Sequence, residues 1–146
     1  MKLMNRVLIA FTLVFAATAF SASAKVPGLN QPAYNQATAI NLFGTITAIR
    51  EVPAGSPLEG VHLAVKAKNV TYDVYLGPAG FMKMLRANYV VGDQVEVSGS
   101  VTKFGDADVV LTREMTERFV TLTLRDYDGA PVWENWGVAI DPASVK

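Results

Sequence analysis

Two alternating runs separated by only two residues constrain this fold more than any other feature of the sequence. Apolar and polar residues alternate in 60–67 and in 70–76, and Lys68-Asn69 between them suits a two-residue turn. Pairing Ala67 with Val70 fixes the register of a β-hairpin, because successive side chains point to opposite faces. One face then carries the apolar pairs Val65–Tyr72, Leu63–Val74 and Val61–Leu76. The other face carries His62 opposite Tyr75, Ala64 opposite Asp73 and Lys66 opposite Thr71.

Further strand signals lie on both sides of this hairpin. Apolar and β-branched residues predict strands at 40–52, 94–101, 108–116 and 119–126, with a bend or bulge at Gly44. A tight turn at Glu117-Arg118 would put Met115 opposite Val120 and Glu114 opposite Thr121. Gly77-Pro78 ends the hairpin, and a helix is expected over 78–88 with three residues on the core, namely Phe81, Met84 and Leu85.

The order of these elements predicts the fold class. Three strands, a short helix and two strands match a mainly β, OB-like barrel over residues 40–126, with an extra C-terminal strand. In such a barrel the helix plugs one end, and closure of the sheet removes exposed edges. An open antiparallel sheet with one helix is the alternative. Residues 25–39 are expected to form an extended leader that docks through Tyr34. Residues 127–146 form a tail whose Trp133 packs back on the barrel.

The first 24 residues have the pattern of a secretory signal peptide. Lys2 and Arg6 precede an uncharged run over 7–20, and the small residues Ala22 and Ala24 predict cleavage after Ala24. The alternative is a membrane anchor, for which 14 apolar residues are fewer than the roughly 20 that span a bilayer. We therefore expect a soluble periplasmic protein with no stable membrane anchor after cleavage.

Composition narrows the possible functions. The chain has no cysteine, which excludes thiolate metal sites, haem attachment through paired cysteines and cysteine nucleophiles. Without Lys2 and Arg6 there are 11 basic and 13 acidic residues, a net charge near −2, so a nucleic-acid partner is not expected. No nucleophile elbow, paired metal-binding histidines or phosphate loop is present. We expect a non-enzymatic protein without a cofactor.

Five short motifs recur in order over about 41–133: Gly60-Val61-His62-Leu63, Val74-Tyr75-Leu76-Gly77-Pro78, the run 92–100, Thr112-Arg113-Glu114, and Leu124-Arg125-Asp126 with Gly129, Pro131 and Trp133. With these motifs the chain resembles a family of small exported bacterial proteins whose domain is similar to that of the magnetosome-associated proteins MamS and MamX. It implies an OB-like periplasmic module, sometimes found near redox or iron-handling proteins. It brings no established catalytic residues.

The polar face of the hairpin is the candidate binding site. His62, the only histidine, shares this face with Asp73, Tyr75 and Lys66, and these four residues are expected to bind a protein partner or a small ligand on an outward, solvated surface. In one alternative, His62 and Asp73 ligate a metal in a metal or redox accessory protein. In another, the protein is a scaffold that acts by adding a β-strand at an exposed sheet edge.

Overall fold

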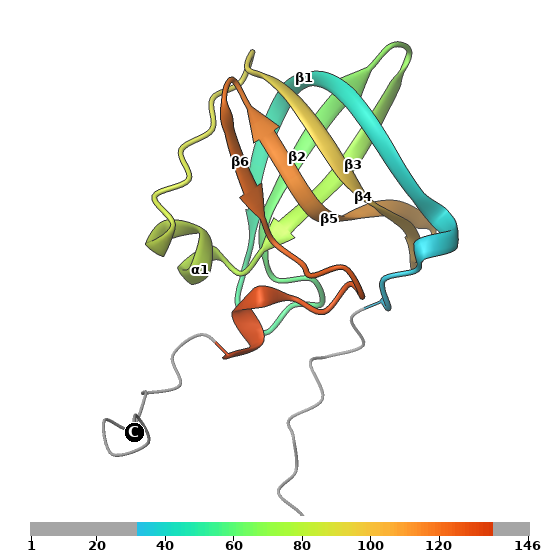
Figure 1. Ribbon diagram of the computed structural model, residues 1–146, viewed down its shortest axis with the longest axis vertical. Coiled ribbons are helices and arrows are strands. Elements are labelled where there is room, and N and C mark those ends of the chain that lie inside the picture. Colours follow the sequence, from blue (N-terminus) through green and yellow to red (C-terminus); the bar gives the residue numbers. More distant parts are fainter. Residues whose placement is uncertain (1–31, 136–146) are drawn as a thin grey trace, which may run out of the picture.

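The computed structural model describes residues 32–135 as a ring of β-strands closed at one end by a short helix (Figure 1). The predicted signal peptide and the last part of the predicted tail lie outside the described residues. The elements, in chain order, are η1 (Gln36–Thr38), β1 (Ala39–Val52), β2 (Gly60–Ala67), β3 (Val70–Gly77), α1 (Ala79–Met84), β4 (Gln94–Phe104), β5 (Ala107–Glu117), β6 (Val120–Thr123) and η2 (Val132–Asn135).

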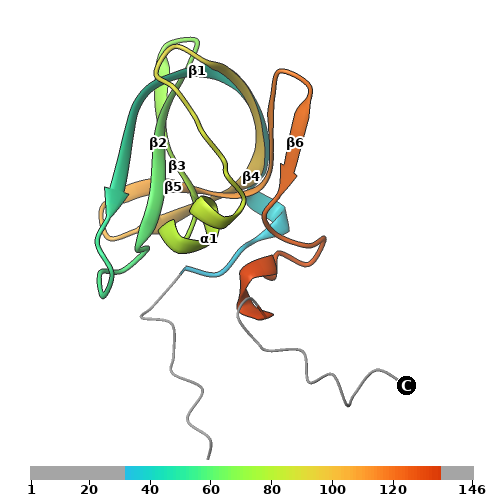
Figure 2. The same ribbon diagram turned by 90° about the vertical axis from the view of Figure 1, so that its left-hand side faces the viewer.

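Strand pairing follows the expected OB-like arrangement. The sheet order is β3-β2-β1-β4-β5-β6, and an additional parallel pairing of β3 with β5 closes the first five strands into a ring. Figure 2 shows this ring with α1 beneath it and β6 standing apart at its right-hand side. The fold is therefore mainly β, and α1 lies between the third and fourth strands, as the order of sequence signals predicts.

β1 is long enough to serve two neighbours. Its first half pairs with β4, from Ala39 to Thr45, and its second half pairs with β2, from Thr45 to Val52. Gly44 stands where the strand passes from one neighbour to the other. A Cβ atom there would lie 2.6 Å from the carbonyl oxygen of Lys66, so only glycine permits this close approach. The register shift itself lies beyond the expected position, between Ile46 and Ala48.

The interior of the ring holds the main hydrophobic core. Its buried residues come from every strand of the ring, from α1 and from the segment after β6: Leu42, Ile46, Leu63, Val65, Val74, Leu76, Phe81, Met82, Val95, Val97, Val110, Met115 and Leu124. A second cluster of Leu58, Tyr75, Val109 and Leu111 packs with Tyr34, Phe104 and Trp133. Val109 and Leu111 flank the inward Val110, so this second cluster covers the outside of the ring. The expected packing of Tyr34 and Trp133 against the ring is confirmed.

The helix prediction needs correction. α1 has six residues and ends at Met84, because the next residues leave the helix and Arg86 adopts a left-handed φ of 53°. Phe81 is buried as expected, but Met82 is its buried neighbour, whereas Met84 and Leu85 are 50% and 36% exposed. A helical repeat continued past residue 84 therefore assigned two of the three core positions wrongly.

Two predicted registers also change. In the first hairpin a bulge pairs Val61 with Gly77 in place of Leu76, while the other predicted pairs hold. In the second hairpin the turn is Arg118-Phe119, with Arg118 at a left-handed φ of 58°. Met115 therefore pairs with Leu122, and Glu114 pairs with Thr123. The shift places Phe119 at the tip, fully exposed.

Candidate functional site

Strand register brings three polar side chains, Arg50, His62 and Asp73, together on the outside of the ring. Arg50 of β1 pairs with His62 of β2, which pairs with Tyr75 of β3, and Asp73 lies one step along β3 opposite Ala64. Asp73 accepts a hydrogen bond from Arg50 Nη2 at 2.5 Å through Oδ2 and lies 2.9 Å from His62 Nδ1 through Oδ1. The hairpin register predicts this meeting of His62 with Asp73, and β1 adds the guanidinium.

His62 is enclosed on all sides. Its Nε2 atom lies 2.8 Å from the carbonyl oxygen of Leu58, and its ring centroid lies 5.0 Å from that of Tyr75. The residue is only 2% exposed. Nε2 therefore faces the Leu58 carbonyl oxygen, and Nδ1 faces Asp73 and also lies 3.3 Å from Arg50 Nη2. His62 thus ties the β1–β2 loop, through Leu58, to the carboxylate of Asp73.

The ionisation of this cluster follows from its surroundings. Burial alone raises the pKa of Asp73, but the hydrogen bond from His62 and the charges of His62 and Arg50 outweigh burial and hold that pKa below its ordinary value of 3.8. Burial raises the pKa of Tyr75 to about 12, and its hydroxyl donates to the Glu59 carbonyl oxygen at 3.1 Å. Asp73 is therefore the anion of the cluster at neutral pH, and Tyr75 is a neutral donor.

The expectation of a solvated surface at these residues is wrong for two of them. Tyr75 is fully buried and His62 almost so, because the β1–β2 loop folds over them and inserts Leu58. Leu58 adopts a left-handed φ of 51°, which turns the loop onto the ring. Lys66 is exposed and pairs with Thr71 farther along the hairpin, apart from the His62 cluster. The hairpin signal locates the cluster but carries no information about the loop that covers it.

Arg50 is the site residue that sequence reasoning missed. Its side chain is 57% exposed, while that of Asp73, which holds it, is 26% exposed. The residue lies near the end of the first predicted strand. Its pairing with His62 depends on the bulge between Ile46 and Ala48, and no residue there predicts a bulge. The outward part of the cluster is therefore a positioned guanidinium rather than an imidazole.

The metal alternative finds little support in this geometry. Among residues 32–135 no three histidine, aspartate or glutamate side chains lie close enough together to hold a metal ion. Both nitrogens of His62 already face acceptors, so ligation would require breaking the contact with Asp73 or with Leu58.

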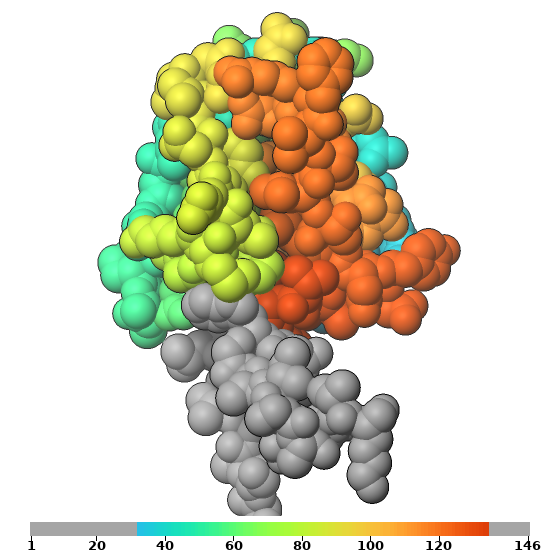
Figure 3. All heavy atoms as spheres, turned by 60° about the vertical axis from the view of Figure 1, so that its left-hand side comes forward, coloured from blue at the N-terminus to red at the C-terminus, as the bar shows by residue number. Residues whose placement is uncertain are grey.

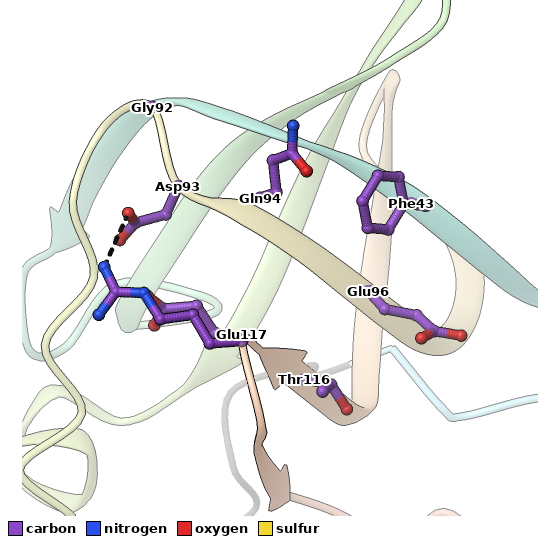
Figure 4. Close-up of a pocket in the computed structure, with 8 residues that line it drawn as sticks. Phe43, Gly92, Asp93, Gln94, Glu96, Thr116 and Glu117 are labelled. Carbon is purple, nitrogen blue, oxygen red and sulfur yellow. Dashed lines mark ion pairs between the residues drawn. The ribbon is translucent and has the colours of Figure 1, made fainter.

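A separate hollow of about 420 Å³ lies on the outer face of β4 and β5 (Figure 4). Arg118 reaches across it to Asp93 at 3.6 Å and to Glu117 at 3.7 Å. Burial and the nearby carboxylate of Asp93 raise the pKa of Glu117. Phe43, Gln94, Glu96 and Thr116 complete the lining. Arg118, Asp93 and Glu117 in this hollow are therefore paired with one another.

Comparison with known proteins identifies the family of the chain. None of the helices in the described part of the chain is long and apolar enough to cross a membrane. No curated protein matches the sequence. Residues 38–122, which cover β1 to β5 and most of β6, match the MamS/MamX magnetosome protein family. Since this match spans more than half of the chain, the protein belongs to the MamS/MamX magnetosome protein family.

Proposed function

We propose that this protein is a non-enzymatic, periplasmic binding module that holds the anionic group of a protein partner or small ligand on the outer face of β1, β2 and β3. The observation that carries the proposal is the position of Arg50. Its guanidinium is held by Asp73, which also contacts His62, and yet the Arg50 side chain is 57% exposed. A guanidinium with its rotamer already restricted loses less entropy when it binds a carboxylate or phosphate.

The surface beside Arg50 suits a docked ligand. Ala48 and Ala64 are paired on neighbouring strands next to Asp73, so small side chains separate Arg50 from Lys66. Arg50 and Lys66 thus lie on either side of these two small side chains, and Lys66 makes no ion pair with any described residue. A ligand with two acidic groups, or an acidic peptide, would contact both cations. In this proposal His62, Tyr75 and Asp73 position the surface, and Arg50 and Lys66 touch the ligand.

The absence of enzymatic activity is likewise part of the proposal. His62 would be the natural general base, but a base needs a free nitrogen facing substrate, and the ring is enclosed by Asp73, Leu58 and Tyr75. Its contacts support a positioning role. Periplasmic location rests on the signal-peptide pattern of residues 1–24. Cell fractionation, with the mass of the isolated chain, tests it, and a mature chain that begins at Lys25 is expected.

Affinity capture with matched charge variants tests the proposed surface. The wild-type chain, Arg50→Ala and Lys66→Ala are immobilised and exposed to periplasmic extract of the source bacterium, and retained proteins and small molecules are quantified. Lys103→Ala is the control, because Lys103 is an exposed cation that pairs with Asp108 on a different strand pair. We expect Arg50→Ala to lose a species that wild type and Lys103→Ala both retain. Equal retention by Arg50→Ala and wild type would contradict the proposal.

A further inference from the structure

β6 is an edge strand without the usual protection. In residues 32–135 it pairs with β5 alone, and Figure 2 shows it outside the ring with its far side uncovered by other described strands. The strand reads Val120-Thr121-Leu122-Thr123 and contains no charge, proline or glycine. Natural edge strands commonly carry a lysine, a proline or a bulge that prevents pairing with another chain. This edge has none of these features.

The ladder shows which backbone groups of β6 are free. The Leu124 amide donates to the Arg113 carbonyl oxygen at 2.7 Å, and hydrogen-bonded pairs alternate along an antiparallel ladder. Leu122 and Val120 are therefore the residues whose backbone groups face β5. The amide and carbonyl groups of Thr121 and Thr123 point away from β5, where no described strand meets them. The free edge thus offers hydrogen-bonding groups at two positions.

Apolar side chains gather around this edge. Phe119 is 101% exposed and Val120 is 64% exposed, although both are large and hydrophobic. In Figure 3 the hairpin of β5 and β6 (orange) lies beside the segment that follows α1 (yellow-green), and a groove of about 250 Å³ lies between them. The apolar residues lining that groove are Leu85, Tyr89, Met115, Val120 and Leu122. An exposed apolar surface next to an unpaired edge is typical of a protein interface.

We propose that a second copy of this chain pairs with β6, edge to edge and antiparallel, around a twofold axis at Thr121. Antiparallel pairing joins residues on the same face, so Thr121 meets its own equivalent while Val120 meets Leu122 of the other copy. The two free Thr121 amides then bond to the two free Thr121 carbonyl groups. Residues 119–123 of each copy then form both sides, with Phe119 opposite Thr123, as a twofold interface requires.

Charge also favours a second copy over an unrelated strand. Arg118 stands at the start of β6 with its side chain 76% exposed, and the turn after β6 carries the exposed residues Asp126 and Asp128. Antiparallel pairing brings the start of one strand beside the end of the other. Each Arg118 therefore approaches the acidic turn of the other copy, twice in the dimer. This surface is separate from Arg50. Arg50 lies in the half of β1 that pairs with β2, whereas the other half pairs with β4.

Sedimentation of the full chain over a wide concentration range tests the dimer. Wild type is expected to shift from monomer to dimer as concentration rises. Thr121→Pro removes the backbone donor that the dimer uses and no backbone bond to β5, although the hydroxyl contact of Thr121 with Thr116 is also lost. It should weaken the dimer about tenfold or more. Val120→Lys should also weaken it. Val70→Lys is the matched control, because Val70 likewise follows a two-residue turn and is 51% exposed. That variant should dimerise like wild type.

Cysteine cross-linking checks the register without relying on loss of association. The chain has no cysteine, so Thr121→Cys introduces one thiol at the proposed axis. A short bis-maleimide should join two Thr121→Cys chains, and should not join Thr71→Cys chains, whose thiol lies in the other hairpin. Wild type that stays monomeric at all concentrations would overturn the proposal. So would a dimer unaffected by both Thr121→Pro and Val120→Lys. Neither result bears on capture through Arg50, because that assay follows a different surface.

Discussion

Replacing Asp73 with alanine should cost about 2–3 kcal/mol of unfolding free energy, and the structure sets that size. His62 is 2% exposed, so its Nδ1 atom would lose the carboxylate partner in a nearly dry site, a loss of about 1–3 kcal/mol. Arg50 is 57% exposed and can return to water, so its ion pair adds less than about 1 kcal/mol. Urea unfolding at pH 7 measures the change, with an unchanged m-value expected.

An exposed ion pair provides the control for Asp73→Ala. Asp108 contacts Lys103 at 2.8 Å, a distance similar to that between Asp73 and His62, but their side chains are 57% and 71% exposed. Asp108→Ala should therefore cost less than about 1 kcal/mol. If the two alanine variants lose equal stability, the burial of His62 is not what gives the Asp73 contact its strength.

Acid should erase the difference between wild type and Asp73→Ala. The pKa of Asp73 is lower in the folded chain than in the unfolded chain, so its contribution is complete above the unfolded value of about 3.9 and declines as the pH falls through the lower folded value. The gap in unfolding free energy should thus narrow as the pH falls below about 4. A gap that stays constant down to pH 3 would refute this reasoning.

Five further substitutions test the fold by the same urea assay. Gly60→Ala should cost several kcal/mol, because φ is 128° and a Cβ would lie 2.1 Å from a carbonyl oxygen at the end of β3, whereas Gly105→Ala, at φ 60° in open space, should cost about 1 kcal/mol. Leu58→Ala should cost about 2–5 kcal/mol, since Leu58 is 2% exposed in the outer cluster; a cost under 1 kcal/mol would mean that the loop is not anchored there. Phe119→Ser should change the free energy of unfolding by no more than about 0.5 kcal/mol, whereas Phe81→Ala should lower it by about 3–5 kcal/mol. A large loss of stability in Phe119→Ser would contradict the exposed position of Phe119 in the turn.

The sequence was most informative where local chemistry decides the structure. An alternating pattern with a two-residue turn fixes the hairpin around Lys68-Asn69, and this register alone brings His62 beside Asp73 and Tyr75. The ring closure also follows from element order, because few folds place a short helix between the third and fourth strands. Both predictions depend on contacts between residues close in sequence or on the order of whole elements.

The remaining errors have non-local causes. His62 is covered by Leu58, which adopts a left-handed backbone conformation. Leu58 contacts Val109 and Leu111, which lie about 50 residues later in the sequence. The position of Arg50 depends on a bulge in β1. In the second hairpin, two neighbouring residue pairs could each form the turn, and the choice of Arg118-Phe119 moved the register. The side-chain pattern does not distinguish the two registers, because each face of the short strand carries both apolar and polar residues.

The division of β1 between two neighbours has a consequence for how the ring opens. Because one half of β1 pairs with β4 and the other with β2, detaching this strand breaks two ladders at once and leaves no smaller closed sheet. Amide hydrogens near Ile46, which is fully shielded from solvent, should therefore exchange with deuterium only when the whole domain unfolds. The β1–β4 ladder joins residues more than 45 positions apart, so a slow folding step, governed by the search for that pairing, is expected as well.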